Sequence, residues 1–335
     1  MFKRVLAALA AVGVVVCVAL PTTAAAITLK LAHQWPQNED DYVIATAQKF
    51  ADEVEKRSGG DIKIRFFPAQ SLVKAKDTHV ALKSGAVDLA IYPYIYAAGA
   101  IPQMNLILLP GLWESHDDVY RFHNSQAWKE LEAKAENYGF KTLAWIQIGG
   151  GFASGPKAIV APEDVKGMKL RAAGKFMEYA LQQAGASTVS MPSSDTYGAM
   201  QRSLLGGVLT SSSSLGAYRM YEVSKYYVSP EDYGVYYTIE PIAISMRTWE
   251  RLSPEQQKIM VEAGKSVEPM ALKGAKAEDA RVAKLFADNG VDVQKLTEAE
   301  WKQWRDLFQK TAFPQFEEQV PGGKALLQKA VNAAP

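Results

Sequence analysis

A guanidinium group at the end of a short strand is the clearest chemical feature of this sequence. Residues 164–171 read as a turn followed by a short alternating strand, and Arg171 stands at the carboxyl end of that strand. The planar fork of an Arg side chain fits the two oxygens of a carboxylate or a sulfonate. Because most exposed Arg side chains are simply solvated, Arg171 indicates an anion site only together with the rest of the chain.

No group of residues in the sequence has the pattern of a catalytic centre. The sequence contains no G-x-S-x-G nucleophile motif, no Walker loop and no H-E-x-x-H zinc motif. His33 is expected to be a structural histidine, and the other three, His79, His116 and His123, lack the spacing of metal ligands. We therefore expect no catalysis, no cofactor and no bound metal.

The first 26 residues have the features of a secretory signal peptide. Two basic residues precede an uncharged apolar run over residues 5–20, and the small residues 24–26 form a cleavage signal. The apolar run is roughly 16 residues long, shorter than the ~20 residues that a membrane-spanning helix needs. Cys17 does not suit a lipoprotein signal, because two bulky valines precede it. We expect cleavage after Ala26 and export to the periplasm.

Without the signal peptide the chain has no cysteine and is close to neutral. Two of the 37 Lys and Arg residues belong to the expected signal, which leaves 35 basic residues against 36 acidic ones. The lack of thiols suits an oxidising compartment. No basic patch stands out, so we expect no nucleic-acid partner. The remaining residues, about 309, are enough for two domains.

Strands and helices alternate in the first half of the chain. Apolar residues at alternating positions or in continuous runs predict strands, and apolar stripes at helical spacing predict helices. In chain order these are a strand at 28–32, a helix at 42–56, a strand at 62–67, a helix at 73–83, a strand at 87–91, a helix at 117–137 and a strand at 141–148. This order predicts an α/β fold whose parallel sheet has helices on both faces.

A second α/β unit is expected to begin at the glycine triplet 149–151, which reads as a flexible crossing point or a tight turn. Its predicted strands lie at 168–171, at 188–190 and near 208, and its predicted helices lie at 176–183, 195–202 and 215–222. A long apolar strand at 235–245 leads back to the first unit. Ser253 and Gln256 fit a capping box for a helix that continues to about residue 289. That helix, roughly 50 Å long, could span both units.

Nine short segments carry a resemblance to a known family. The mature chain resembles the extracytoplasmic solute-binding subunit of tripartite ATP-independent periplasmic (TRAP) transporters, the DctP-like family. In the family's order, the matching segments are LAHQWP at 31–36, FADEV at 50–54, SGG at 58–60, ALKSGAVD at 81–88, LPGLW at 109–113, PEDVKGMKLR at 162–171, MP at 191–192, YEVSKY at 221–226 and SMRTW at 245–249. Each segment is weak alone, and their common order over the whole chain carries the resemblance.

The resemblance implies a two-domain periplasmic-binding-protein fold with a ligand cleft between the domains and a long helix that spans them. The first domain is expected to comprise residues 27–148 plus about 233–272, and the second residues 149–232 plus about 273–335. Such a protein captures a small organic acid, a carboxylate or a sulfonate, and delivers it to the membrane subunits of a TRAP permease. We expect it to act as a monomer.

The resemblance also implies which segments form the walls of the cleft. Arg171 is expected to bind the acidic group of the solute. The other expected ligand-binding residues come from the loop after residue 33, the loop after Ile91, the loop at 191–195, the segment after Gly207 and the aromatic residues near 236; they are Gln34, Trp35, Asn38, Tyr92, Tyr94, Met191, Ser193, Asp195, Thr210, Ser211 and Tyr236. Glu240 and Asp195 are more simply explained as salt-bridge partners.

Two departures from the family pattern bear on the solute. Relatives often have a second Arg after a Gly-Phe pair, whereas Phe152 is followed here by Ala153 and Ser154. A serine run at 211–214 stands where relatives often have Glu-Asn-Pro, so hydroxyls would replace an amide. We therefore expect a solute with one acidic group plus hydroxyl, keto or aromatic functions. A ligand-sensing adaptor for a membrane receptor and, more remotely, a periplasmic organic-acid enzyme remain as alternatives.

Overall fold

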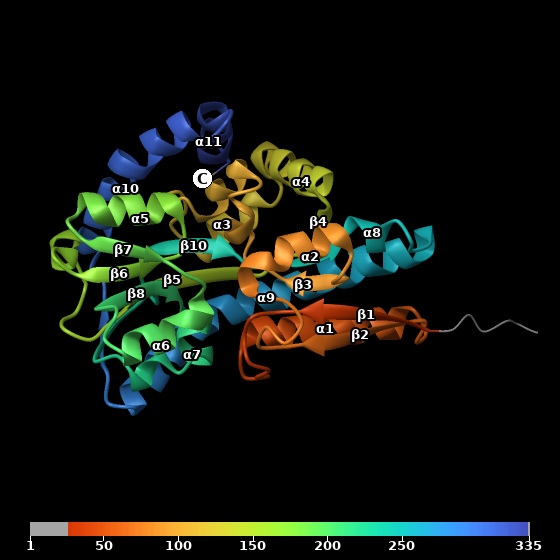
Figure 1. Ribbon diagram of the computed structural model, residues 1–335, viewed down its shortest axis with the longest axis horizontal. Coiled ribbons are helices and arrows are strands. Elements are labelled where there is room, and N and C mark those ends of the chain that lie inside the picture. Colours follow the sequence, from red (N-terminus) through yellow and green to blue (C-terminus); the bar gives the residue numbers. More distant parts are fainter. Residues whose placement is uncertain (1–25, 334–335) are drawn as a thin grey trace, which may run out of the picture.

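The computed structural model describes residues 26–333, which fold into two mixed β-sheets with helices packed around them (Figure 1). The expected signal peptide lies outside the described residues, apart from Ala26. The order of strands is β2-β1-β3-β11-β4 in the first sheet and β12-β9-β5-β8-β6-β7 in the second, where β10 also pairs with β5. The predicted α/β class and the presence of two units are confirmed.

The first sheet is built from two distant parts of the chain. Its strands are β1 (Ile27–Ala32), β2 (Ile62–Phe67), β3 (Leu89–Ile91), β4 (Phe140–Ala144) and β11 (Ile242–Ser245). Strand β1 pairs in parallel with β2 and β3, as predicted, but β11 lies antiparallel between β3 and β4. The expectation of a wholly parallel sheet is therefore wrong, because β11 enters this sheet from the second one and runs in the opposite direction.

The helices of the first half include the predicted ones, with two differences: one predicted helix is divided, and the 3₁₀ helices at 94–97 and 102–108 were not predicted. They are α1 (Tyr42–Arg57), η1 (Ala75–Asp77), α2 (Thr78–Ser84), η2 (Tyr94–Ala97), η3 (Pro102–Leu108), α3 (His116–Phe122) and α4 (Gln126–Tyr138). The predicted single helix at 117–137 is two helices. Ser125 has extended backbone angles, and its side chain accepts a hydrogen bond from the Trp128 N–H, so it caps a new helix at that point.

The second sheet contains the strand ends that matter for function. Its strands are β5 (Gln147–Ser154), β6 (Lys169–Ala172), β7 (Ser187–Ser190), β8 (Gly207–Ser211), β9 (Tyr226–Ser229), β10 (Tyr236–Ile239) and β12 (Asp292–Lys295). Its short helices are η4 (Pro162–Val165), α5 (Lys175–Gln183), η5 (Ser193–Asp195), α6 (Thr196–Gln201), α7 (Ser212–Ala217) and η6 (Met220–Glu222). The predicted helix at 215–222 starts earlier, because Ser211 caps α7 and accepts a hydrogen bond from the Ser214 N–H.

The glycine triplet lies inside a strand, so its prediction as a crossing point or tight turn is wrong. All three glycines are buried residues of β5. Strand β8 pairs with residues 150–154 of β5, β9 with residues 153–154, and β10 with residues 147–150. A Cβ atom on Gly151 would overlap the carbonyl oxygen of Val228 in β9, and one on Gly150 would overlap the ring of Tyr236. The glycines are needed for close approach of neighbouring chain segments rather than for a bend.

Two strand connections and one helix link the sheets. The chain passes from β4 to β5 at Trp145 and Ile146, and it returns from β10 to β11 at Glu240 and Pro241. These connections are adjacent, because the Glu240 N–H donates to the Ile146 carbonyl (2.9 Å). The predicted long strand at 235–245 is thus two strands, one in each sheet.

The third link is α9 (Pro254–Asp288), which contacts α1 and β4 beside the first sheet and β5, β9 and β12 of the second (Figure 1). Ser253 caps it, and Gln256 completes the predicted capping box. Three further helices, none of them predicted, complete the chain: α8 (Met246–Trp249), α10 (Glu298–Gln319) and α11 (Gly323–Val331).

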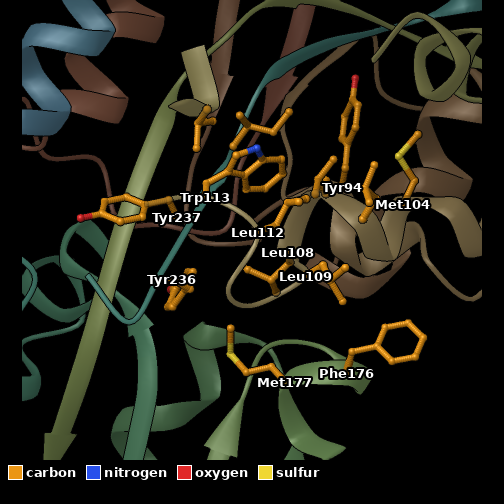
Figure 2. Close-up of a cluster of buried hydrophobic side chains, with 14 of the residues drawn as sticks. Tyr94, Met104, Leu108, Leu109, Leu112, Trp113, Phe176, Met177, Tyr236 and Tyr237 are labelled. Carbon is orange, nitrogen blue, oxygen red and sulfur yellow. The ribbon is translucent and has the colours of Figure 1, made fainter. Parts of the chain in front are cut away.

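The largest hydrophobic core is continuous between the two sheets. Figure 2 shows Leu108 and Leu109 between Tyr94 and Met104 on one side and Phe176 and Met177 of α5 on the other. The segment that contains η3 therefore packs against the second unit as well as the first. The segment belongs to the first of the two expected domains, residues 27–148 plus about 233–272. These domain boundaries stay a prediction.

Candidate functional site

A small cavity lies where the ends of both sheets meet. From the second sheet and its loops it is lined by Arg171 of β6, Thr210 and Ser211 of β8, Ser193 of η5, and Tyr236 and Thr238 of β10. The opposite wall comes from Pro93, Ile95, Tyr96 and Leu108, and Glu240 lies at the return connection. The carboxyl ends of β6 and β8, which run in parallel, thus face this cavity.

Arg171 is held rigidly at this cavity and is almost completely buried, with 1% of its surface exposed. Its Nε–H donates to the carbonyl oxygen of Met191 and an Nη1–H donates to that of Leu209, each at 3.0 Å. A guanidinium has five N–H donors, so these two bonds fix its plane and leave others for a guest. Among residues 26–333 no carboxylate forms an ion pair with it. This arrangement is suited to an anion in bidentate contact.

Hydroxyl groups surround the guanidinium. Thr210 and Tyr236 both line the cavity, and burial raises the pKa of Tyr236 well above its ordinary value, so its phenol stays neutral. Ser214 donates to the Ser193 hydroxyl (3.4 Å) and accepts from Trp35 Nε1 (3.1 Å). Neutral hydroxyls of this kind can donate to or accept from the polar groups of a bound molecule.

Glu240 is the other ionisable group at the cavity. It is 4% exposed, and its Oε2 atom has no hydrogen-bond partner among the described residues. Burial, followed by the nearby carboxylate of Asp41, raises the pKa of Glu240 well above its usual range, and Arg171 only partly offsets this. The expectation that Glu240 and Asp195 form salt bridges is wrong for the described part of the chain, where neither is in an ion pair.

Four hydrogen bonds join the two walls of the cavity region. Trp35 donates to Ser214, Tyr218 donates to the Gln34 carbonyl (3.1 Å), Ser213 donates to Asp41 (2.6 Å), and the Ser193 N–H donates to the Tyr96 hydroxyl (3.2 Å). In each pair one residue belongs to the part of the chain before residue 97 and the other to the part after residue 190. The cleft is therefore closed, and its closed state is stabilised by direct contacts.

The structure brings about half of the predicted ligand-binding residues to this cavity. Arg171, Ser193, Thr210, Ser211 and Tyr236 line it directly. Trp35 reaches it through Ser214, and Met191 supplies the carbonyl that orients the guanidinium. Gln34 is buried close to these contacts, with both polar atoms of its side chain unpartnered among the described residues.

The remaining four predicted residues do not lie at the cavity. Tyr92 and Tyr94 are core residues whose hydroxyls bond to His79 (3.2 Å) and Thr142 (2.7 Å). Figure 2 shows the Tyr94 side chain within the hydrophobic cluster. Asn38 and Asp195 are exposed to solvent. In the 3₁₀ helix η2, Ile95 and Tyr96 line the cavity, whereas Tyr94 and Ala97 belong to the hydrophobic core.

Sequence reasoning missed several lining residues. Tyr96, Ser214, Thr238 and Glu240 all line the cavity and were not among the expected ligand-binding residues. The sequence contains one signal for Glu240: a carboxylate followed by proline in the middle of an apolar stretch is unusual, because buried acids need a partner. The others carry no signal that distinguishes them from neighbouring tyrosines and serines.

Within residues 26–333 no helix is both long and apolar enough to cross a membrane. In the same part of the chain, no group of three or more His, Cys, Asp or Glu side chains is arranged to hold a metal ion. Burial lowers the pKa of His33 to about 4, so its ring is neutral at pH 7.

Comparison with known proteins agrees with this geometry. Residues 31–319 match the model of the DctP family, bacterial extracellular solute-binding protein, family 7. The chain is 34% identical over 305 residues to a solute-binding protein of Albidiferax ferrireducens, covering 90% of each chain. A 2,3-diketo-L-gulonate-binding periplasmic protein of Escherichia coli is 24% identical over 310 residues, 92% of each chain.

Solved structures show the same fold. A TRAP periplasmic solute-binding protein from Rhodoferax ferrireducens, with bound malonate, superposes with a TM-score of 0.89 at 33% identity, covering 91% of this chain and 98% of that one. The recognition of the family from the nine sequence segments is confirmed, and the family is one of binding proteins. The chain belongs to the DctP family of bacterial extracellular solute-binding proteins and is a solute-binding protein of the TRAP type.

Proposed function

We propose that this protein captures a small organic acid in the periplasm, with Arg171 binding its carboxylate, and delivers it to the membrane subunits of a TRAP permease. The proposal is carried by the guanidinium of Arg171, which is buried at the cavity between the two sheets and has no carboxylate partner within residues 26–333. Hydroxyls from Ser193, Thr210, Ser211 and Tyr236 surround the rest of the solute. Export through a signal peptide cleaved after Ala26 and action as a monomer complete the proposal.

The charges at the cavity favour a solute with one acidic group. Arg171 is the one cation among the described lining residues. Lys175 and Arg202, which could have supplied a second one, are exposed and outside the cavity. Burying a second carboxylate without a cation costs several kcal/mol unless hydrogen bonds replace it. Malonate, bound by the Rhodoferax relative, is a diacid and is therefore the most informative competitor.

The first test is a thermal-shift panel at pH 7 with 2-oxobutyrate, succinate, malonate and D-galacturonate. We expect at least one acid to raise the melting temperature, because a ligand that binds only the folded state stabilises it. The C4 monoacid 2-oxobutyrate should give a larger shift than succinate. A clearly larger shift with succinate or malonate would mean that a further cation reaches the cavity. No shift with any organic acid in a wider screen would contradict the proposed solute class.

The second test concerns motion of the two units. The four hydrogen bonds between the walls form only when the cleft is shut, so a solute that contacts both walls should shift the population toward the closed state. Small-angle scattering should show a smaller radius of gyration with a saturating acid from the panel than without it. An Arg171→Ala variant under the same conditions serves as the control and should not contract. An identical radius with and without the acid would indicate a rigid site.

A further inference from the structure

The unpartnered carboxyl of Glu240 is the feature of the cavity that solute capture by Arg171 does not explain. A carboxylate beside a buried guanidinium would ordinarily pair with it, yet these two side chains form no ion pair among the described residues. Glu240 has its backbone N–H fixed to Ile146 and its Oε2 atom unpartnered, and it is 4% exposed. A buried polar atom without a partner costs free energy, so its place at the cavity points to a ligand contact.

The charges around Glu240 decide the form in which it makes that contact. Asp41 is the carboxylate that helps to raise the pKa of Glu240, and it accepts hydrogen bonds from Ser213 and from two backbone N–H groups at the start of α1. Arg171 of β6, Tyr96 and Tyr236 line the same cavity as Glu240. Glu240 also contributes to the raised pKa values of the Tyr42, Tyr218 and Tyr236 phenols. Arg171 thus acts on Glu240, whereas the cation that acts on Asp41 is Arg281 of α9. Adding an anionic solute on Arg171 further disfavours a negative charge on Glu240.

We propose that Glu240 acts on the solute as a neutral carboxylic acid and donates a hydrogen bond from its unpartnered oxygen to a second oxygen function of the solute. The solute class is therefore a carboxylate that carries a hydrogen-bond acceptor, such as a keto oxygen. An amino acid is disfavoured, because a neutral carboxyl supplies no negative charge to balance a buried ammonium group. This inference rests on the proposed function, since Arg171 must hold the carboxylate for Glu240 to meet the second group. Burial and Asp41 raise the pKa of Glu240 well above its usual range, which favours its neutral form.

Three C4 ligands that differ only at the second carbon can distinguish a neutral Glu240 from an ionised one. With the full mature chain at pH 7, calorimetry should show tighter binding of 2-oxobutyrate than of L-2-aminobutyrate, by about tenfold or more, with butyrate between them. An ionised Glu240 would reverse this order, because it would pair with the ammonium group and repel the keto oxygen. Tighter binding of 2-aminobutyrate would thus overturn the inference and leave capture by Arg171 intact.

Variants of Glu240 test its role as a donor. Glu240→Gln keeps a neutral donor, so its affinity for 2-oxobutyrate at pH 7 should stay within about threefold of wild type, whereas Glu240→Ala should lose about tenfold. When the pH is raised above 7, the wild-type affinity should fall as Glu240 ionises, and that of Glu240→Gln should stay constant. Glu250→Gln, an exposed change of the same kind, should behave as wild type. The same pH dependence in wild type and Glu240→Gln would contradict the inference.

A comparison without any ligand keeps the inference testable if none of the C4 acids binds. A carboxyl whose pKa is higher in the folded state than in the unfolded state keeps its proton to a higher pH when the protein is folded. The free energy of unfolding therefore falls as the pH rises above the pKa that the carboxyl has in the unfolded state. The melting temperature of Glu240→Gln minus that of wild type should therefore be larger at pH 8 than at pH 5. An equal difference at both pH values would show that Glu240 is ionised in the folded protein.

Discussion

Arg171→Ala is expected to weaken binding of the preferred acid by about 2–5 kcal/mol, the range for loss of one partner of a buried charge pair. The loss is large because the solute carboxylate would be left in a closed cavity with no other cation in the described lining. The change removes the two donors to Met191 and Leu209 as well, but those carbonyls lie on the loop and strand that remain. Titration calorimetry measures the affinity, and circular dichroism shows that the fold is retained.

Arg171→Lys and Arg202→Ala sharpen this test. A lysine restores the charge but not the planar fork, so we expect only partial recovery of affinity. Arg202 is exposed at the end of α6, so its replacement removes a positive charge without touching the cavity. It should bind as wild type does. Near wild-type affinity in Arg171→Ala would show that the acidic group binds elsewhere.

Gly151→Ala is expected to cost about 1–3 kcal/mol of stability or more, which is the usual range for overpacking a buried position. The new methyl group would overlap the backbone carbonyl of Val228, and a backbone atom cannot rotate away as a side chain can. Strands β5 and β9 would have to move apart. Urea denaturation should show a lower midpoint with an unchanged slope.

Gly155→Ala and Gly150→Ala complete the series. Gly155 lies just beyond the end of β5 and has no atom within contact distance of an added Cβ, so its replacement should change stability little. Gly150→Ala should disturb both stability and binding, because its Cβ would overlap the Tyr236 ring at the cavity. Equal stability of Gly151→Ala and Gly155→Ala would refute the close approach of β5 and β9.

The sequence predicted most elements of the fold because their signals are local. The capping box at Ser253 and the apolar stripe of α1 depend only on neighbouring residues, and both predictions are confirmed. The place of β11 between β3 and β4 depends on pairing across some 150 residues, and periodicity contains no information about it. The prediction of a crossing point or tight turn at the glycine triplet was wrong for the same reason. The residues that the glycines approach closely, Val228 and Tyr236, are far away in the sequence.

The sequence predicts a site residue only where its side chain has few possible roles at its position in the fold. A guanidinium at a strand end indicates an anion, and Arg171 does line the cavity. Tyrosines carry no comparable signal, since a phenol serves equally well in a core or a cleft. The structure therefore separates Tyr94 and Tyr96, two residues apart, into core and cavity. The apolar stretch around Glu240 indicates that its carboxyl is buried, but the proximity of Asp41, some 200 residues earlier, is not visible in the sequence.

The position of β11 has a consequence for how the chain reaches its native state. Strands β3 and β4 flank a gap in the first sheet that only residues 242–245 fill, so neither can complete its hydrogen bonds until that part of the chain is available. Pairings between such distant segments require closure of long loops, and they slow folding. During synthesis the amino-terminal part would stay incomplete, with unpaired strand edges. Under the proposed export to the periplasm, this delay would keep the polypeptide unfolded for longer. It would also lengthen the time during which those edges can pair with other chains.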